Sequence, residues 1–173
     1  MSNRLFAAIR GIVYACVFVA LWTWVVLTVR PLDQWIAIEF PAWLQLPGVL
    51  VAGLGLALAL SCVAVFALRG KGTPAPFDAP REFVAVGPYR YVRNPMYLGA
   101  IFTLLGVGLA LRSPSTLGVA VGFWLLAHSF VVLYEEPDLE RRFGESYRRY
   151  LRQVGRWVPR SLNAQRRRPP PRW

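Results

Sequence analysis

The sequence is poor in the residues that build metal centres and disulfide frameworks. Its 173 residues include one histidine and two cysteines. Cys16 and Cys62 each lie inside a long apolar block, without the Cys or His neighbours that a metal site needs. A thiol in such a block is also a poor disulfide partner. We interpret both cysteines as small apolar side chains and expect no metal cofactor.

Charge is scarce as well, and it is unevenly placed. Charged residues make up 17% of the chain and only 9 residues are acidic, whereas 55% are hydrophobic. A soluble domain mixes charged and apolar residues every few positions, but here long apolar blocks alternate with short arginine-rich stretches. This segregation excludes an ordinary soluble domain and is typical of a chain whose solvent is lipid.

The apolar blocks predict the membrane spans, at residues 11–29, 47–68, 96–111 and 116–134. The first reaches roughly 28 Å as a helix, enough to cross a bilayer core. Trp22, Trp24 and Trp35 lie towards its far end, where an aromatic belt is expected. In the second block, Gly55 and Ala59 have the spacing that allows close helix contact. The short turn at 113–115 predicts that the third and fourth spans form an antiparallel hairpin.

An amphipathic helix is predicted after the fourth span, with Pro137 in its first turn. Apolar residues recur at steps of three and four, while arginines occupy the other face; the apolar positions are Leu139, Phe143, Tyr147, Tyr150, Leu151 and Val154. The predicted fold is therefore an all-α membrane protein with about four transmembrane helices plus a C-terminal amphipathic helix. Its predicted parts are two N-terminal spans (1–71), a core (72–159) and a basic tail (160–173).

The basic residues predict the orientation. With both termini in the cytoplasm, 18 of the 20 Lys and Arg residues lie on the inner side, and the exceptions are Arg30 and Arg112. The positive-inside rule explains this distribution, so we expect the bilayer and not nucleic acid as the partner. The predicted location is the cell inner (plasma) membrane. The sequence leaves the oligomeric state open.

Charged residues and tyrosines, which could bind a ligand or take part in catalysis, lie at the inner ends of the third and fourth spans. Residues 87–97 begin the third span and Glu135–Glu136 end the fourth, so the hairpin places them on one membrane face. Pro95 leaves free backbone N–H groups in the first helical turn, which favour an anion. The pocket suits a zwitterion: Glu135 for an ammonium, Arg93 for a carboxylate and tyrosine faces for a sulfonium. The alternative is that these charges only anchor the helices at the interface.

Three sequence blocks in this region resemble a known family. They are Gly-Pro-Tyr-Arg-Tyr-Val-Arg-Asn-Pro-Met-Tyr from Gly87, Glu-Glu-Pro-x-Leu-x-x-x-Phe-Gly-x-x-Tyr-x-x-Tyr from Glu135, and Val-Gly-Arg-Trp-Val-Pro from Val154. Together they resemble the isoprenylcysteine carboxyl methyltransferase and phospholipid methyltransferase superfamily. The resemblance covers residues 72–159 and is specific for the superfamily, but not for a substrate.

The resemblance implies a membrane enzyme that uses S-adenosylmethionine, with the cofactor in a cytoplasmic cavity and a lipid-like acceptor that enters from the bilayer. Arg93, Glu135 and His128 are the catalytic candidates. Backbone contacts to the cofactor are implied for Arg81, Glu82, Phe83 and Val84. The other implied cofactor-binding residues are Tyr89, Asn94, Pro95, Met96, Tyr97 and Glu135.

Two departures from the family pattern bear on the acceptor. Asn94 stands where many members have His, so it keeps a hydrogen-bonding role and loses a titrating one. Val131 stands where the isoprenylcysteine enzymes carry an Arg for the substrate carboxylate, which leaves a lipid amine or a thiol open. His128 lies seven residues before Glu135, which predicts one shared helix face. It is either a base for the acceptor or a hydrogen-bonding residue between helices.

Two other functions compete with methyl transfer. Membrane sterol reductases look similar in the C-terminal segment but use NADPH, and the adjacent carboxylates Glu135 and Glu136 would repel its 2′-phosphate. A non-enzymatic membrane adaptor would use the basic tail and the amphipathic helix. An adaptor function leaves residues 72–97 and the two glutamates unexplained.

Overall fold

The computed structural model describes residues 2–69 and 86–160 of the chain. The predicted cofactor contacts at Arg81, Glu82, Phe83 and Val84 lie outside the described residues, as does the basic tail beyond residue 160.

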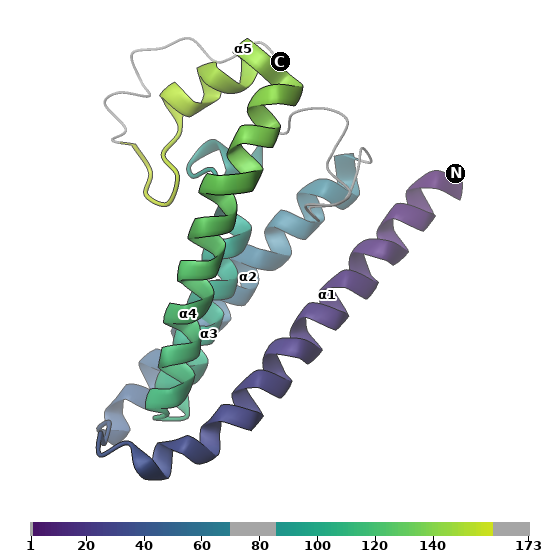
Figure 1. Cartoon of the computed structure of the whole chain (residues 1–173). Coiled ribbons are helices and arrows are strands. Elements are labelled where there is room, and N and C mark those ends of the chain that lie inside the picture. The colour runs from purple at the N-terminus through teal and green to yellow at the C-terminus, as the bar shows by residue number, and fades with distance from the viewer. Residues whose placement is uncertain (1, 70–85, 161–173) are drawn as a thin grey trace.

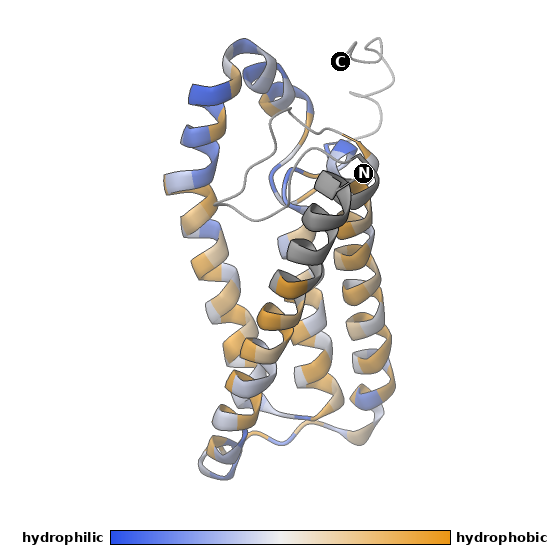
Figure 2. Cartoon of the chain, turned by 90° about the vertical axis from the view of Figure 1, so that its right-hand side faces the viewer, coloured by the Kyte–Doolittle hydropathy of each residue, from blue (hydrophilic) through white to orange (hydrophobic). Residues whose placement is uncertain are grey.

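Long helices dominate the described chain (Figure 1). Three segments are long and apolar enough to cross a membrane, and α3 is a shorter apolar helix beside them. The predicted all-α membrane fold is therefore confirmed. The hydrophilic residues gather at α5, and the apolar ones cover the long helices (Figure 2). The five α-helices are α1 (Ser2–Val29), α2 (Gln45–Arg69), α3 (Pro95–Ala110), α4 (Pro114–Phe130) and α5 (Glu136–Gln153).

Helices α2 and α3 approach so closely that no side chain fits at Gly55 or Gly99 in their contact. A Cβ atom at Gly55 would lie 2.5 Å from the Thr103 backbone nitrogen, and one at Gly99 would lie 2.7 Å from the Ala59 nitrogen. Small residues let helix backbones meet in lipid, where packing replaces the hydrophobic effect. The spacing of Gly55 and Ala59 thus predicted the contact face correctly. Helix α3 also forms the predicted hairpin with α4, but α2 is its main partner.

Helix α1 contacts both α2 and α4, and it packs on α4 through aromatic rings, while the turn that follows α1 caps α4. The Trp22 ring packs edge-on against Phe123 of α4, with centroids 4.7 Å apart. At the far end of the bundle, Asp33 Oδ1 accepts a hydrogen bond of 2.9 Å from the Ser115 backbone N–H, in the first turn of α4. Trp22 therefore points into the bundle, and its expected place in an aromatic belt is wrong. Trp24 and Trp35 are exposed as that belt requires.

The helix is not interrupted between the fourth span and Pro137. Instead, α4 continues into the amphipathic helix α5 through a π-helical turn at Val131–Glu135, so one helical run extends from Pro114 to Gln153. Proline lacks an N–H and its ring clashes with the carbonyl four residues earlier; a wider turn before it accommodates both effects. The chain bends further on, at Gly144, whose φ of 53° is non-helical. Beyond it, Tyr147 and Tyr150 turn inward and are buried with Val154.

The glycine contact predicts that an alanine substitution lowers stability strongly at Gly55 and hardly at all at Gly53, two residues away. Gly55→Ala places a methyl group against the α3 backbone, which must move, at a cost of about 1–3 kcal/mol in the free energy of unfolding. Gly53→Ala, which meets nothing within 4 Å, is the matched control and retains or raises stability. Unfolding of both variants in micelles measures the difference. Equal stabilities would contradict the observed helix contact.

Candidate functional site

The segment before α3 is held in place by the far end of α5. It begins with a 3-10 turn at Gly87–Arg90. The Tyr150 hydroxyl donates a hydrogen bond of 2.7 Å to the Tyr89 carbonyl, which fixes this turn from above. The Arg93 backbone N–H then donates to the Gly155 carbonyl at 2.8 Å, beside a parallel bridge between Val92 and Gly155. Two chain segments about sixty positions apart thus form one surface.

Residues 154–160, here called the strap, return from α5 across the start of α3. The Asn94 amide donates to the Arg156 carbonyl at 3.3 Å. The Trp157 indole N–H donates to His128 Nδ1 at 3.0 Å, which ties the strap to α4. Arg156 and Trp157 were not predicted as site residues. In the sequence they belong to the Val-Gly-Arg-Trp-Val-Pro block, which marks the family resemblance but does not indicate a catalytic or binding role for either residue.

The two adjacent glutamates have different partners. Glu136 binds the Arg156 guanidinium through both oxygens, at 2.9 and 2.8 Å, and also the Arg93 guanidinium at 2.7 Å. The hydrogen bond to Glu136 raises the pKa of Arg156, so this arginine stays charged. Glu135 instead accepts a hydrogen bond of 3.1 Å from the Tyr97 hydroxyl. Glu136 therefore joins the strap to α3, whereas Glu135 is left beside the cavity.

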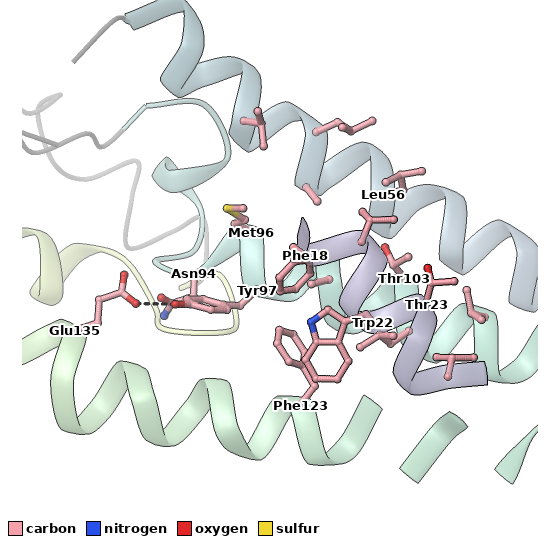
Figure 3. Close-up of a pocket in the computed structure, with 18 of the residues that line it drawn as sticks. Phe18, Trp22, Thr23, Leu56, Asn94, Met96, Tyr97, Thr103, Phe123 and Glu135 are labelled. Carbon is pink, nitrogen blue, oxygen red and sulfur yellow. Dashed lines mark hydrogen bonds between the residues drawn. The ribbon is translucent and has the colours of Figure 1, made fainter. Parts of the chain in front are cut away.

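A cavity of about 680 Å³ runs from these polar residues along the apolar helices. Figure 3 shows Glu135 and Tyr97 hydrogen-bonded at one end, and Phe18, Trp22 and Phe123 further along. Burial also raises the pKa of the Tyr89 phenol, which keeps this part of the wall neutral. The polar lining residues are Tyr89, Arg93, Asn94, Tyr97 and Glu135 at this end, with Thr23 and Thr103 deeper.

Of the eight predicted site residues that the structure describes, six meet here. Tyr89, Arg93, Asn94, Met96, Tyr97 and Glu135 all line the cavity. Pro95 is buried at the start of α3 and supports its neighbours without lining the cavity.

His128 was expected on the same helix face as Glu135, and that placement is wrong. Glu135 lines the cavity, but His128 is not among its lining residues and its Nδ1 is engaged by Trp157. The π-helical turn between the two residues explains the difference, because it shifts the α-helical phase of the residues after it.

The polar end of the cavity has the groups that a zwitterionic, sulfonium-bearing ligand needs. Glu135 keeps an oxygen for an ammonium, because its one hydrogen bond within the described chain, from Tyr97, uses Oε2. Arg93 Nε is buried and has no hydrogen-bond partner among the described residues, so it can donate to a carboxylate. The rings of Tyr89 and Tyr97 line the same end and can contact a cation through their faces. The residue chemistry therefore fits S-adenosylmethionine.

The strap gives a stability prediction. Arg156→Ala removes two charge-assisted hydrogen bonds to Glu136, whose side chain is only 14% exposed, and we expect a loss of about 1–3 kcal/mol in unfolding free energy. Arg152→Ala is the control, because the Arg152–Glu145 pair is about 60% exposed on both sides and is worth less than ~1 kcal/mol. Hydrogen exchange of residues 154–160 should also accelerate in the first variant only. Unchanged exchange would contradict the role of Arg156.

Comparison with known proteins agrees with this geometry. Residues 43–146, more than half of the chain, match the phospholipid methyltransferase family. This match includes all of α2, α3 and α4, both glutamates and the first part of α5. An uncharacterised protein of Haemophilus influenzae is 42% identical over 64 residues, which are 36% of this chain and 100% of that protein. The chain belongs to the phospholipid methyltransferase family and is a membrane methyltransferase.

Proposed function

We propose that the protein transfers a methyl group from S-adenosylmethionine to a lipid-like or membrane-partitioning acceptor at the cytoplasmic face of the inner (plasma) membrane. One observation carries the proposal: the Glu135–Tyr97 pair lies where a polar pocket meets a long apolar cavity. This arrangement suits a charged cofactor and an apolar acceptor side by side. Both chain termini lie in the cytoplasm in this proposal, in agreement with the basic residues.

The proposed roles follow the chemistry of each side chain. Glu135 holds the cofactor ammonium, and Arg93 together with the first turn of α3 holds its carboxylate. Tyr89 and Tyr97 line the sulfonium, while Asn94, Pro95 and Met96 shape the pocket at the start of α3. The segment Arg81, Glu82, Phe83 and Val84 is proposed to add backbone contacts. When bound, the cofactor supplies a methyl group that is already activated by positive charge.

The protein contributes to the reaction mainly by aligning the acceptor with the methyl group of the cofactor. The apolar walls exclude water and hold the acceptor chain, so that its reactive atom stays at the polar end beside Glu135. Orientation of this kind can lower a barrier by about 7–11 kcal/mol. An amine or thiol acceptor must also lose a proton, and Glu135 is already assigned to the cofactor ammonium in this proposal. A base role for His128 remains a prediction, and it would have to use Nε2 because Nδ1 accepts from Trp157.

Val131 narrows the acceptor class but does not identify the acceptor. Val131 is buried where an arginine would be needed for a substrate carboxylate, which favours a lipid amine or a thiol over an isoprenylcysteine carboxylate. The NADPH-dependent reductase and the adaptor are the competing functions. Family membership supports the methyltransferase over both. Displacement of S-adenosylmethionine by NADPH would support the reductase.

The cofactor assignment is tested by carboxylate variants. Glu135→Gln keeps the size of the side chain and its hydrogen bond from Tyr97 but removes the charge that binds an ammonium. We expect a loss of S-adenosylmethionine affinity of about tenfold or more, equivalent to ~1.4 kcal/mol. Equilibrium binding of labelled S-adenosylmethionine to purified protein in micelles measures it.

Glu145→Gln is the matched control, because Glu145 lies on the exposed part of α5 and pairs with Arg152. This variant should bind the cofactor like the unmodified protein. Undiminished binding by Glu135→Gln, with the fold retained, would remove Glu135 from the proposed site.

A further inference from the structure

The cavity is lined by two charged side chains of the described chain, Arg93 and Glu135. Glu135 is the acidic one, at the polar end shown in Figure 3. Arg93 is the basic one, and its Nη1 donates to the Glu136 carboxylate at 2.7 Å. An arginine paired with one carboxylate has little net attraction for a second anion, because the two opposite charges nearly cancel. By itself, this ion pair would make Arg93 a weak site for a ligand carboxylate.

Arg156 changes this charge balance from outside the cavity. It is not among the lining residues, yet its guanidinium donates to both oxygens of Glu136, at 2.9 and 2.8 Å. The three side chains have two positive formal charges and one negative charge, so the cluster has an excess of positive charge. Arg93 is the part of the cluster that lines the cavity. A carboxylate bound there therefore meets a net positive cluster and not a neutral pair.

Burial allows the more distant charge to act on the cavity. The side chains of Arg93 and Glu136 are 12% and 14% exposed, and that of Arg156 is 32% exposed. Charges in a partly buried site are screened less than charges on the surface, so Arg156 acts on a ligand that it does not touch. Arg152 differs in this respect, because it is 59% exposed and its partner Glu145 is 61% exposed.

We propose that Arg156 is a positioning residue for the anionic end of the ligand: it holds Glu136, so that Arg93 can bind a carboxylate, and it thereby sets a preference for ligands that have one. This role rests on the proposed function in one respect, that the carboxylate is that of S-adenosylmethionine. It is separate from the contribution of Arg156 to the strap. The Asn94 amide is held by the backbone carbonyl of Arg156, which any residue at this position retains.

Decarboxylated S-adenosylmethionine isolates this effect, because it keeps the ammonium and the sulfonium but lacks the carboxylate. Equilibrium binding of both ligands to the full-length protein in micelles gives the carboxylate preference, defined as the dissociation constant of the decarboxylated ligand divided by that of S-adenosylmethionine. Arg156→Gln removes the charge and keeps an N–H donor for Glu136. We expect the carboxylate preference to fall about tenfold, since only the affinity for S-adenosylmethionine drops. Arg156→Lys keeps the charge and should retain most of the preference.

Glu136→Gln should change the carboxylate preference in the opposite direction. It disrupts the same cluster but removes the negative charge from between the two arginines, so the preference should rise. A purely structural cluster would weaken both ligands alike in Arg156→Gln and in Glu136→Gln, and the preference would not move. Glu136→Gln and Arg156→Lys decide the question even where Arg156→Gln does not fold. Arg152→Gln is the matched control, because it removes an exposed positive charge and should leave the preference unchanged.

An unchanged carboxylate preference in Arg156→Gln would overturn the role of Arg156, as would a shift in the same direction in Arg156→Gln and Glu136→Gln. Equal affinities of the unmodified protein for the two ligands would overturn it too, because Arg93 would then hold no carboxylate. Failure of the unmodified protein to bind either ligand would refute the proposed function, and the role of Arg156 with it. The binding of the unmodified protein thus separates the two failures.

Discussion

The ion cluster of Glu136 with Arg93 and Arg156 joins three parts of the chain that are far apart in sequence. Glu136 begins α5, Arg93 precedes α3, and Arg156 belongs to the strap. Its contacts are short and largely shielded, and removal of one partner from such a cluster leaves charge without compensation. The cluster keeps the strap over the start of α3, so that Asn94 is held by the Arg156 carbonyl and Tyr89 lies under Tyr150. The polar end of the cavity depends on this arrangement.

Because Glu136 is the carboxylate that binds both arginines, the neighbouring Glu135 is not part of this ion cluster. Adjacent residues on a helix point in different directions, so when Glu136 turns to the two arginines, Glu135 faces the cavity and meets Tyr97. The π-helical turn before Pro137 sets this phase. π-Bulges are frequent at functional sites, and this one separates Glu135 from His128, which the α-helical repeat would have placed together. One carboxylate is structural and the other is available for a ligand.

The membrane spans and the gathering of residues 87–97 near Glu135 could be predicted from the sequence, because both follow from hydrophobic length and a short turn. The contact at Gly55 and Ala59 was equally accessible, since small residues at that spacing permit close packing. The strap could not be predicted, because its contacts are not encoded in local pattern. They are the backbone bridge of Gly155 to Val92, the ion pair of Arg156 with Glu136 and the hydrogen bond from Trp157 to His128. Trp22 was misplaced because an aromatic near a span end suits a membrane interface as well as a cavity, and only the tertiary contact with Phe123 decides.

The central claim is that the polar end beside Glu135 and the apolar cavity together form one methyl-transfer site. Incubation of purified protein with methyl-labelled S-adenosylmethionine and a membrane lipid extract, followed by mass spectrometry, tests it most directly. We expect label in a lipid product that gains one methyl group, and its loss when Glu135 is changed to Gln. Label that stays entirely in the cofactor, with binding intact and a complete lipid extract supplied, would contradict the claim.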